Sequence, residues 1–346
     1  MTDQHRFRKL YLGTFVVSGL LVLCLADWFG REIESRSCVA DVASGDNCPK
    51  EHLLLNSLDL ERLGATGLKQ GKYDLAQRCF EKLILQLERK PGCTPQQLVV
   101  AVGNLGKAFQ GQGENSKAIP MFKRALELQE RAYGLESSEL ILCLSSIAYS
   151  NQELSQFDEA EKYRKRCLLI SRNCYGRESP QFTGALSDLG VLYYMANRTE
   201  QSIAVFSEVL RLDEKIAGNK SLDFCRDLCN LAESFRYQGK LSKAEPLFCR
   251  ALLTLDQRGF SDHSTAAFIS NNLGLLYVSQ GKYQLAESLY KRSLSTRLRL
   301  YGAKNPYVGL TLSNYSVLLR KANRIDEAAK LETRALATYP FDKSKL

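Results

Sequence analysis

Seven small residues recur along this chain of 346 residues at intervals of 42 positions. These register residues are Gly64, Gly106, Ala148, Gly190, Ala232, Gly274 and Ser316. Twelve positions after each of them comes another small residue, in the series Ala76, Ala118, Ala160, Ser202, Ala244, Ala286 and Ala328. Small residues at two fixed offsets let paired antiparallel helices approach closely, and their repetition predicts a stack of helix hairpins. The chain is therefore expected to be an all-α solenoid of seven helix-turn-helix repeats over residues 53–346.

An apolar segment precedes the repeats. Leu10–Ala26 carries no charge and follows Arg6, Arg8 and Lys9. This pattern predicts an apolar helix within residues 1–29 that acts as a signal anchor or as a signal peptide cleaved near Ala26. Residues 30–52 are then a polar linker. The basic residues ahead of the segment favour an array held at the membrane and outside the cytoplasm, with an exported soluble protein as the alternative.

The sequence offers little for catalysis, metal binding or nucleic-acid binding. Its formal charge is +9, with no run of five basic residues, which disfavours nucleic acid as a partner. His263 lies in an Asp-His-Ser stretch, but adjacent residues in a link cannot by themselves form a catalytic triad. Cys225 and Cys229 could share a helix face with a thiol on the partner helix, yet no histidine or fourth thiol is close enough in sequence to complete a metal site. We predict a protein that is not an enzyme and has no cofactor or metal.

The cysteines of the linker and those of the repeats favour different redox states. Cys38 and Cys48 in the linker could close a disulfide loop in an exported domain. The cysteines of the repeat helices, such as Cys143 and Cys167, are expected to be packed free thiols. The oligomeric state is left open by the sequence.

Residues 270–302 show the pattern of one repeat most clearly. Gly274 and Tyr277 lie on a first helix, Gly281 permits a tight turn, and Ala286 and Tyr290 mark the inner side of a second helix. This pattern resembles the tetratricopeptide repeat, and the 42-residue spacing resembles that of kinesin light chains, rather than the common 34 residues. The resemblance covers about residues 53–340 and implies a right-handed solenoid whose first helices line a concave groove.

Three repeats depart from the family pattern. The first has Gly67 where an aromatic residue is usual, and the third has Asn151 and Arg164 at positions that are normally apolar or aromatic. The seventh has Glu332 in place of the aromatic residue of the second helix. A polar residue there is typical of a terminal helix that faces water.

The resemblance also indicates which residues line the groove. The position two residues before each register residue holds Arg62, Asn104, Ser146, Asp188, Asn230, Asn272 and Asn314. An asparagine amide can both donate to and accept from a peptide backbone, and such asparagines commonly hold peptide in these repeats. The predicted peptide-binding residues are Asn104, Asn230, Asn272, Asn314, Arg226, Arg236, Arg320, Tyr194 and Tyr237.

The basic members of this set favour an acidic segment of a partner protein. The predicted function is thus a non-catalytic interaction module that binds an extended, acidic peptide. The alternative is a structural scaffold of a membrane complex that uses the convex face or the ends of the solenoid.

Overall fold

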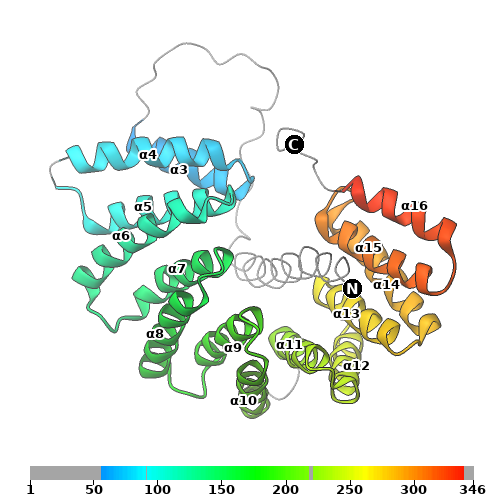
Figure 1. Cartoon of the computed structure of the whole chain (residues 1–346). Coiled ribbons are helices and arrows are strands. Elements are labelled where there is room, and N and C mark those ends of the chain that lie inside the picture. The colour runs from blue at the N-terminus through cyan, green and yellow to red at the C-terminus, as the bar shows by residue number, and fades with distance from the viewer. Residues whose placement is uncertain (1–55, 91, 218–220, 339–346) are drawn as a thin grey trace, which may run out of the picture. The chain divides into compact units, whose positions relative to one another are not determined.

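The computed structural model describes residues 56–90, 92–217 and 221–338, and within them the chain forms fourteen α-helices and one short 3-10 helix, Ser138–Leu140. Consecutive helices pack as antiparallel pairs, which we call helix A and helix B of each hairpin (Figure 1). The packed pairs are α3 (Ser57–Lys69) with α4 (Tyr73–Arg89), α5 (Pro95–Gly111) with α6 (Asn115–Tyr133), α7 (Ile141–Glu153) with α8 (Phe157–Tyr175), α11 (Leu222–Tyr237) with α12 (Leu241–Gln257), α13 (Ser264–Ser279) with α14 (Tyr283–Tyr301), and α15 (Pro306–Lys321) with α16 (Ile325–Leu336). Between α8 and α11 the chain forms α9 (Pro180–Met195), helix A of the fourth repeat, and α10 (Thr199–Ala217), its helix B. The fourteen helices that seven repeats predict are confirmed for the described residues.

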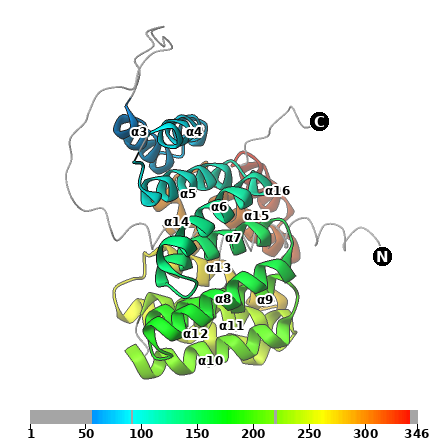
Figure 2. The same cartoon turned by 90° about the vertical axis from the view of Figure 1, so that its left-hand side faces the viewer.

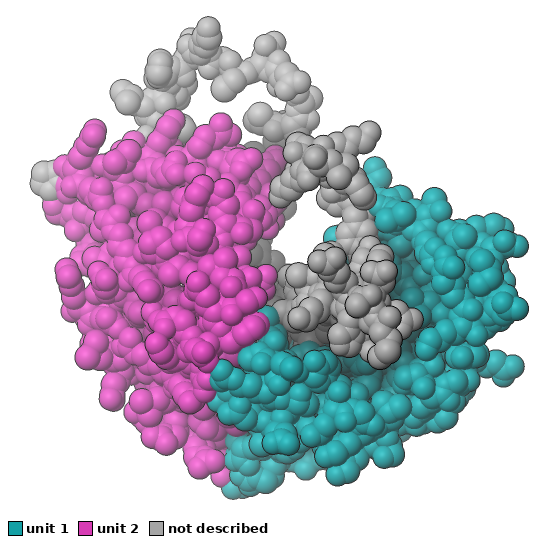
Figure 3. All heavy atoms as spheres, viewed as in Figure 1, with its two compact units in different colours: residues 1–35, 193–346 teal, residues 36–192 magenta. Residues whose placement is uncertain are grey.

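These residues fall into two compact units, which meet in sequence between Leu192 and Tyr193 (Figure 3). We call them the N-terminal unit and the C-terminal unit. In the N-terminal unit, the hairpins follow one another in chain order from α3 to α8 (Figure 2). The predicted apolar segment and the linker lie outside the described residues. Among the residues that are described, no helix has the length and apolar character needed to cross a membrane.

The small residues lie where the hairpin helices touch. Every member of the series that follows the register residues by twelve positions is fully buried, from Ala76 to Ala328. Gly64, Gly106 and Gly274 each face the ring of an aromatic residue sixteen positions further on, in helix B of the same hairpin. A β-carbon added to Gly106 would lie 2.7 Å from the Phe122 ring. In these three hairpins the register residue is small because the aromatic ring of helix B occupies the space of its side chain.

The turn inside each hairpin has one left-handed residue, always seven positions after the register residue. Glycine fills this position in four hairpins, including Gly281, for which the sequence predicted a tight turn. Ser155, Asn197 and Asn323 fill it in the other three, with φ near +60°. Asparagine tolerates this conformation better than most residues, whereas serine is a less usual choice.

The third hairpin replaces the aromatic contact with a polar one. Arg164 takes the position that Phe122 has in the preceding hairpin, and only 3% of its surface is exposed. Its guanidinium donates two hydrogen bonds of 3.1 Å to Gln152 Oε1 and pairs with Asp188 at 2.5 Å. The amide of Asn151 donates to the Ile147 carbonyl. The departure seen in the sequence is thus a buried polar cluster whose donors have partners, rather than a defect of packing.

Ion pairs link successive hairpins. Arg124 pairs with Glu88, Arg166 with Glu130, Arg250 with Glu214, and Arg292 with Asp256; in each pair an arginine of one helix B contacts an acid of the preceding helix B. These groups are partly exposed, so each pair contributes little to stability by itself. They do fix the lateral alignment of neighbouring hairpins.

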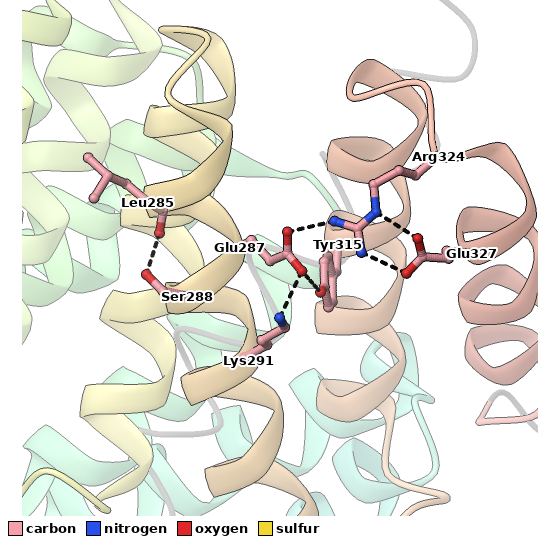
Figure 4. A network of polar contacts seen from close by, with 7 residues as sticks. All are labelled: Leu285, Glu287, Ser288, Lys291, Tyr315, Arg324 and Glu327. Carbon is pink, nitrogen blue, oxygen red and sulfur yellow. Dashed lines mark hydrogen bonds and ion pairs between the residues drawn. The ribbon is translucent and has the colours of Figure 1, made fainter.

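The last two hairpins share a larger network, centred on Glu287 of α14 (Figure 4). Its carboxylate accepts a hydrogen bond from the Tyr315 hydroxyl at 2.7 Å and pairs with Lys291 at 2.8 Å and Arg324 at 2.7 Å. Arg324 also pairs with Glu327 of α16. Hydrogen bonds from Lys291, Tyr315 and Arg324 lower the pKa of Glu287 to about 2.

This network predicts an acid-sensitive C-terminal end. Because the folded-state pKa of Glu287 lies below its ordinary value of 4.5, its contribution to stability is complete above about pH 4.5 and is lost as the pH falls towards 2. We expect Glu287→Gln to lower the thermal midpoint at pH 7. The difference between wild type and variant should shrink between about pH 4.5 and pH 2, measured by circular dichroism. A difference that stays constant over this range would show that the charge of Glu287 does not stabilise the fold.

Candidate peptide-binding surface

Three of the predicted asparagines lie on neighbouring helices of the C-terminal unit. Asn230, Asn272 and Asn314 belong to α11, α13 and α15, and α13 contacts both of the other helices. They lie on the face of each helix A that points away from its helix B, which we call the inner face. Asn314 Nδ2 donates to Asn271 Oδ1 at 3.1 Å, and Asn271 Nδ2 donates to Asn272 Oδ1 at 3.1 Å. An amide chain therefore joins α15 to α13.

The chain of contacts continues to α11 through a cysteine. Asn272 Nδ2 lies 3.8 Å from Cys229 Sγ, and Cys229 is fully buried. Burial raises the pKa of this thiol well above its usual range, so it is neutral and can act as a weak acceptor. Asn271 was not among the predicted residues, although the Asn-Asn pair on α13 was visible in the sequence.

The asparagines differ in exposure. Asn230 and Asn272 are each only 4% exposed, whereas Asn314 is half-buried. The amide of Asn230 has one long contact, 3.4 Å from Nδ2 to Asp227 Oδ1, and its buried Oδ1 has no hydrogen-bond partner in the described part of the chain. A buried acceptor without a donor costs about 1–3 kcal/mol.

The predicted basic residues all have acidic partners on the protein itself. Arg226 pairs with Asp223 at 2.9 Å, Arg236 with Glu233 at 2.8 Å, and Arg320 with Glu332 at 2.7 Å. The Glu233 carboxylate raises the pKa of Arg236, and the side chain of Glu233 is only 3% exposed. Arg320 and Glu332 are both more than one third exposed. Arg320 is the most exposed of these three arginines, at 49% of its side chain against 20% for Arg226 and for Arg236.

Two of the predicted tyrosines meet at the edge of the same face. The rings of Tyr194 and Tyr237 are 5.9 Å apart in an edge-to-face arrangement. Burial raises the pKa of Tyr194, whereas Tyr237 is 56% exposed. Tyr237 therefore exposes an aromatic surface, and the ring of Tyr194 packs against the Tyr237 ring.

Asn104, the remaining predicted residue, belongs to α5 of the N-terminal unit and is half-buried. Lys107 follows it on the same helix, and burial lowers the pKa of its ammonium group. Three residues after Lys107, Gln110 donates to the Ser146 carbonyl at 3.1 Å and to the Ser150 hydroxyl at 2.8 Å. These bonds tie α5 to α7, as Asn271 ties α13 to α15 in the other unit.

The histidine and cysteines considered for catalysis or metal binding have other surroundings. His263 caps α13, with its Nδ1 accepting a hydrogen bond of 3.2 Å from the Thr265 amide. Cys225 and Cys229 are buried free thiols. Within the residues that the structure describes, no three His, Cys, Asp or Glu side chains are grouped so that they could hold a metal ion.

The family assignment rests on the repeats themselves. The tetratricopeptide repeat model matches residues 55–131, 140–215 and 264–340, about two thirds of the chain. The chain belongs to the tetratricopeptide repeat family. No curated protein matches it.

Solved structures of tetratricopeptide repeat proteins share the fold. BtubC (BKLC) from P. vanneervenii is 23% identical, with a TM-score of 0.56 over 65% of this chain and 90% of that one. The TPR-like repeats of a kinesin light chain from Podosopora anserina are 16% identical, with a TM-score of 0.50 over 60% of this chain and 98% of that one. Apo RapI is 13% identical, with a TM-score of 0.60 over 82% and 97%. At these identities the likeness shows the fold alone, and it agrees with the kinesin-light-chain-like spacing of this tetratricopeptide repeat protein.

Proposed function

We propose that this protein is a non-catalytic interaction module whose C-terminal unit binds an extended segment of a partner protein in the groove formed by the inner faces of α11, α13 and α15. Tetratricopeptide repeat arrays are protein-binding scaffolds, and this unit places one asparagine on each of three successive helices A. The observation that carries the proposal is the amide chain from Asn314 through Asn271 to Asn272. A backbone laid across it meets donors and acceptors at intervals of one repeat.

The proposal that the segment is acidic rests on Arg320 alone among the three predicted arginines. Arg226 and Arg236 are occupied by Asp223 and Glu233, whereas Arg320 pairs with the more exposed Glu332 of α16, the helix B of its own hairpin, so a ligand carboxylate would reach Arg320 at the edge of α15 beside the inner face. Because the Arg320 pair is exposed, exchange of Glu332 for a ligand carboxylate costs little. We therefore expect an acid near the end of the segment that lies on α15, and an aromatic contact with Tyr237 near the other end.

The test begins with affinity capture from native membranes, with mass spectrometry to identify the partner. Its binding is then titrated against wild type and against the triple variant Asn230→Ala, Asn272→Ala and Asn314→Ala. Each backbone hydrogen bond is worth about 0.5–1.5 kcal/mol net, so the triple variant should lose about 1.5–4.5 kcal/mol of binding free energy if the effects add. Binding should also weaken as salt rises, because the charge of Arg320 is screened.

Two buried amides are removed in this variant, so its fold needs a control. Circular dichroism should show that the triple variant keeps the helix content of wild type. As a second control, the double variant Gln257→Ala and Gln284→Ala, which changes exposed positions of α12 and α14, should leave the affinity for the partner unchanged. If the triple variant retrieves the same partners with the same titration midpoint, the groove is not the binding site. The scaffold alternative, through the convex face or the ends of the solenoid, would then replace it.

The location of the protein remains a proposal that rests on the sequence. Arg6, Arg8 and Lys9 before the uncharged segment Leu10–Ala26 support attachment to the membrane with the repeats outside the cytoplasm. Cleavage near Ala26 would give an exported soluble protein instead. In either form the partner segment belongs to the same compartment as the repeats.

A further inference from the structure

The residue that caps the start of α13 differs chemically from the caps of neighbouring helices. His263 is the N-cap of α13, and its Nδ1 accepts a hydrogen bond of 3.2 Å from the Thr265 amide. The position eleven residues before the register residue holds serine or asparagine at the start of α9, α11 and α15, namely Ser179, Ser221 and Asn305. Histidine is the side chain that ordinarily gains a proton between about pH 5 and pH 8. His263 is the only histidine among the residues that the structure describes.

The geometry of this cap requires a neutral imidazole ring. A backbone N–H group can only donate, so the Nδ1 atom of His263 must accept and carries no proton. The Thr265 hydroxyl lies 3.1 Å from the same atom. That hydroxyl could accept a hydrogen bond from a protonated ring, but the Thr265 amide would still lose its acceptor.

Protonation of His263 would weaken the start of α13 in two ways. It removes the acceptor of an amide in the first turn. It also adds a positive charge at the end of the helix where the backbone dipole is already positive. Both effects favour the neutral ring in the folded chain. The contribution of the cap to stability is therefore complete above about pH 7.5 and is lost as the pH falls towards about 5.5.

The first turn of α13 is packed into the repeat, so the strength of its cap matters for more than a loose end. Thr265 is 6% exposed, and Ala266 and Ala267 are at most 1% exposed. The Ala267 carbonyl accepts a hydrogen bond of 2.7 Å from the Ser293 hydroxyl of α14, and the Ala267 amide donates to the His263 carbonyl at 3.2 Å. The cap therefore holds the middle helix of the three that carry the candidate asparagines.

The other charged groups around the start of α13 are aspartates and arginines, which ordinarily keep their charge between about pH 5.5 and pH 7.5. Asp262, beside His263, pairs with Arg299 of α14 at 3.0 Å. Helix α15 carries no charge before Arg320. The other charged groups near this end of the packed helices are Asp256 and Arg258 at the end of α12, Arg292 and Arg297 of α14, and Asp223, Arg226 and Asp227 of α11.

We propose that His263 is a pH-sensitive helix cap, which loosens the start of α13 when the pH falls from about 7.5 to about 5.5. Because α13 is the central helix of the candidate peptide-binding surface, acid would also act on that surface. The proposal concerns the helix itself, and it stands or fails whether or not a peptide binds there.

Hydrogen exchange of the full-length protein tests the cap directly. Protection factors, which correct for the intrinsic pH dependence of exchange, are compared at about pH 7.5 and about pH 5.5 for the peptide that covers the start of α13. A helix cap changes an opening equilibrium by about fivefold, so protection should fall about fivefold at the lower pH. The start of α15 is an internal control, because Asn305 accepts from the Tyr307 amide at 2.9 Å with the same two-residue spacing. Its protection should not change.

Two variants separate the cap from other titrating groups. His263→Asn supplies an acceptor that does not titrate, so its protection should be equal at both pH values. His263→Ala lacks the acceptor, so it should show about the fivefold loss already at the higher pH. Circular dichroism should show that both variants keep the helix content of wild type. If the alanine variant does not fold, the comparison of wild type with His263→Asn decides the question alone.

Three results would overturn the proposal. Wild type could keep its protection at the lower pH, which would mean that the cap does not respond to acid. His263→Asn could lose as much protection as wild type, which would assign the loss to one of the surrounding carboxylates. The start of α15 could lose as much as the start of α13, which would show a general effect of acid on the repeats.

Discussion

Replacing Arg164 by alanine is expected to lower the free energy of unfolding by about 3 kcal/mol, although arginine is usually a surface residue. Its side chain fills the space that Phe122 fills in the preceding hairpin, and loss of a buried aromatic residue costs about 3–5 kcal/mol. The variant also removes the two hydrogen bonds that Arg164 donates to Gln152 Oε1, each worth about 0.5–1.5 kcal/mol. Asp188 adds little to the loss, because its side chain is 38% exposed and can regain water.

The comparison variants for Arg164 separate packing from charge. Arg164→Phe restores the apolar volume but lacks the two hydrogen bonds that Arg164 donates to Gln152, so only part of the stability should return; adding Gln152→Leu should recover most of the rest. Arg166→Ala, which removes the half-exposed pair with Glu130, should cost less than about 1 kcal/mol. Urea unfolding followed by circular dichroism measures all four variants. If Arg164→Ala shifts the midpoint no more than Arg166→Ala, the buried cluster does not support the third hairpin.

The repeat pattern made the fold predictable to the level of single contacts. The register residues and the series twelve positions later placed both helices of each hairpin, and Gly281 marked the turn. The prediction succeeds because the helices of each repeat pack in a similar way, so a small residue is found at the equivalent position of all seven repeats. Asn151 and Arg164 of the third repeat could be seen in the sequence to depart from the family pattern, but the sequence did not show that Arg164 is buried and paired. A buried arginine is stable only with the right partners, and Asp188, 24 residues away on the next helix A, emerged as one of them only in the folded chain.

The candidate site stays a prediction, and the structure adds the surroundings of its residues. The slot two residues before each register residue, which the family resemblance assigns to the groove, holds Asn230 on α11 and Asn272 on α13. The sequence could not show that Asn230 and Asn272 are almost fully buried, because burial depends on neighbouring helices. Nor did a count of basic residues show that Arg226, Arg236 and Arg320 are paired. The Arg236 pair follows from i, i+3 spacing with Glu233, whereas Glu332 reaches Arg320 from the following helix.

Gly106 offers the sharpest test of the close helix contact, since Gly103 on the same helix is a natural control. An alanine β-carbon at Gly106 would lie 2.7 Å from the Phe122 ring, and Phe122 is only 2% exposed, so the ring has no free space into which it can move. Overpacking of this kind costs about 1–3 kcal/mol. At Gly103, nothing lies within 4 Å of the added carbon, and alanine should stabilise the helix by about 0.5–1 kcal/mol.

The two substitutions are chemically identical and lie three residues apart in α5, so helix propensity acts on both and only the contact with Phe122 differs. We expect Gly106→Ala to lower the urea midpoint and Gly103→Ala to raise it, with free energies of unfolding at least about 1–3 kcal/mol apart. Phe122→Leu combined with Gly106→Ala should recover part of the loss, because the smaller side chain makes room for the methyl group. If both alanine variants stabilise the protein equally, the 42-residue register reflects something other than steric exclusion between helices A and B.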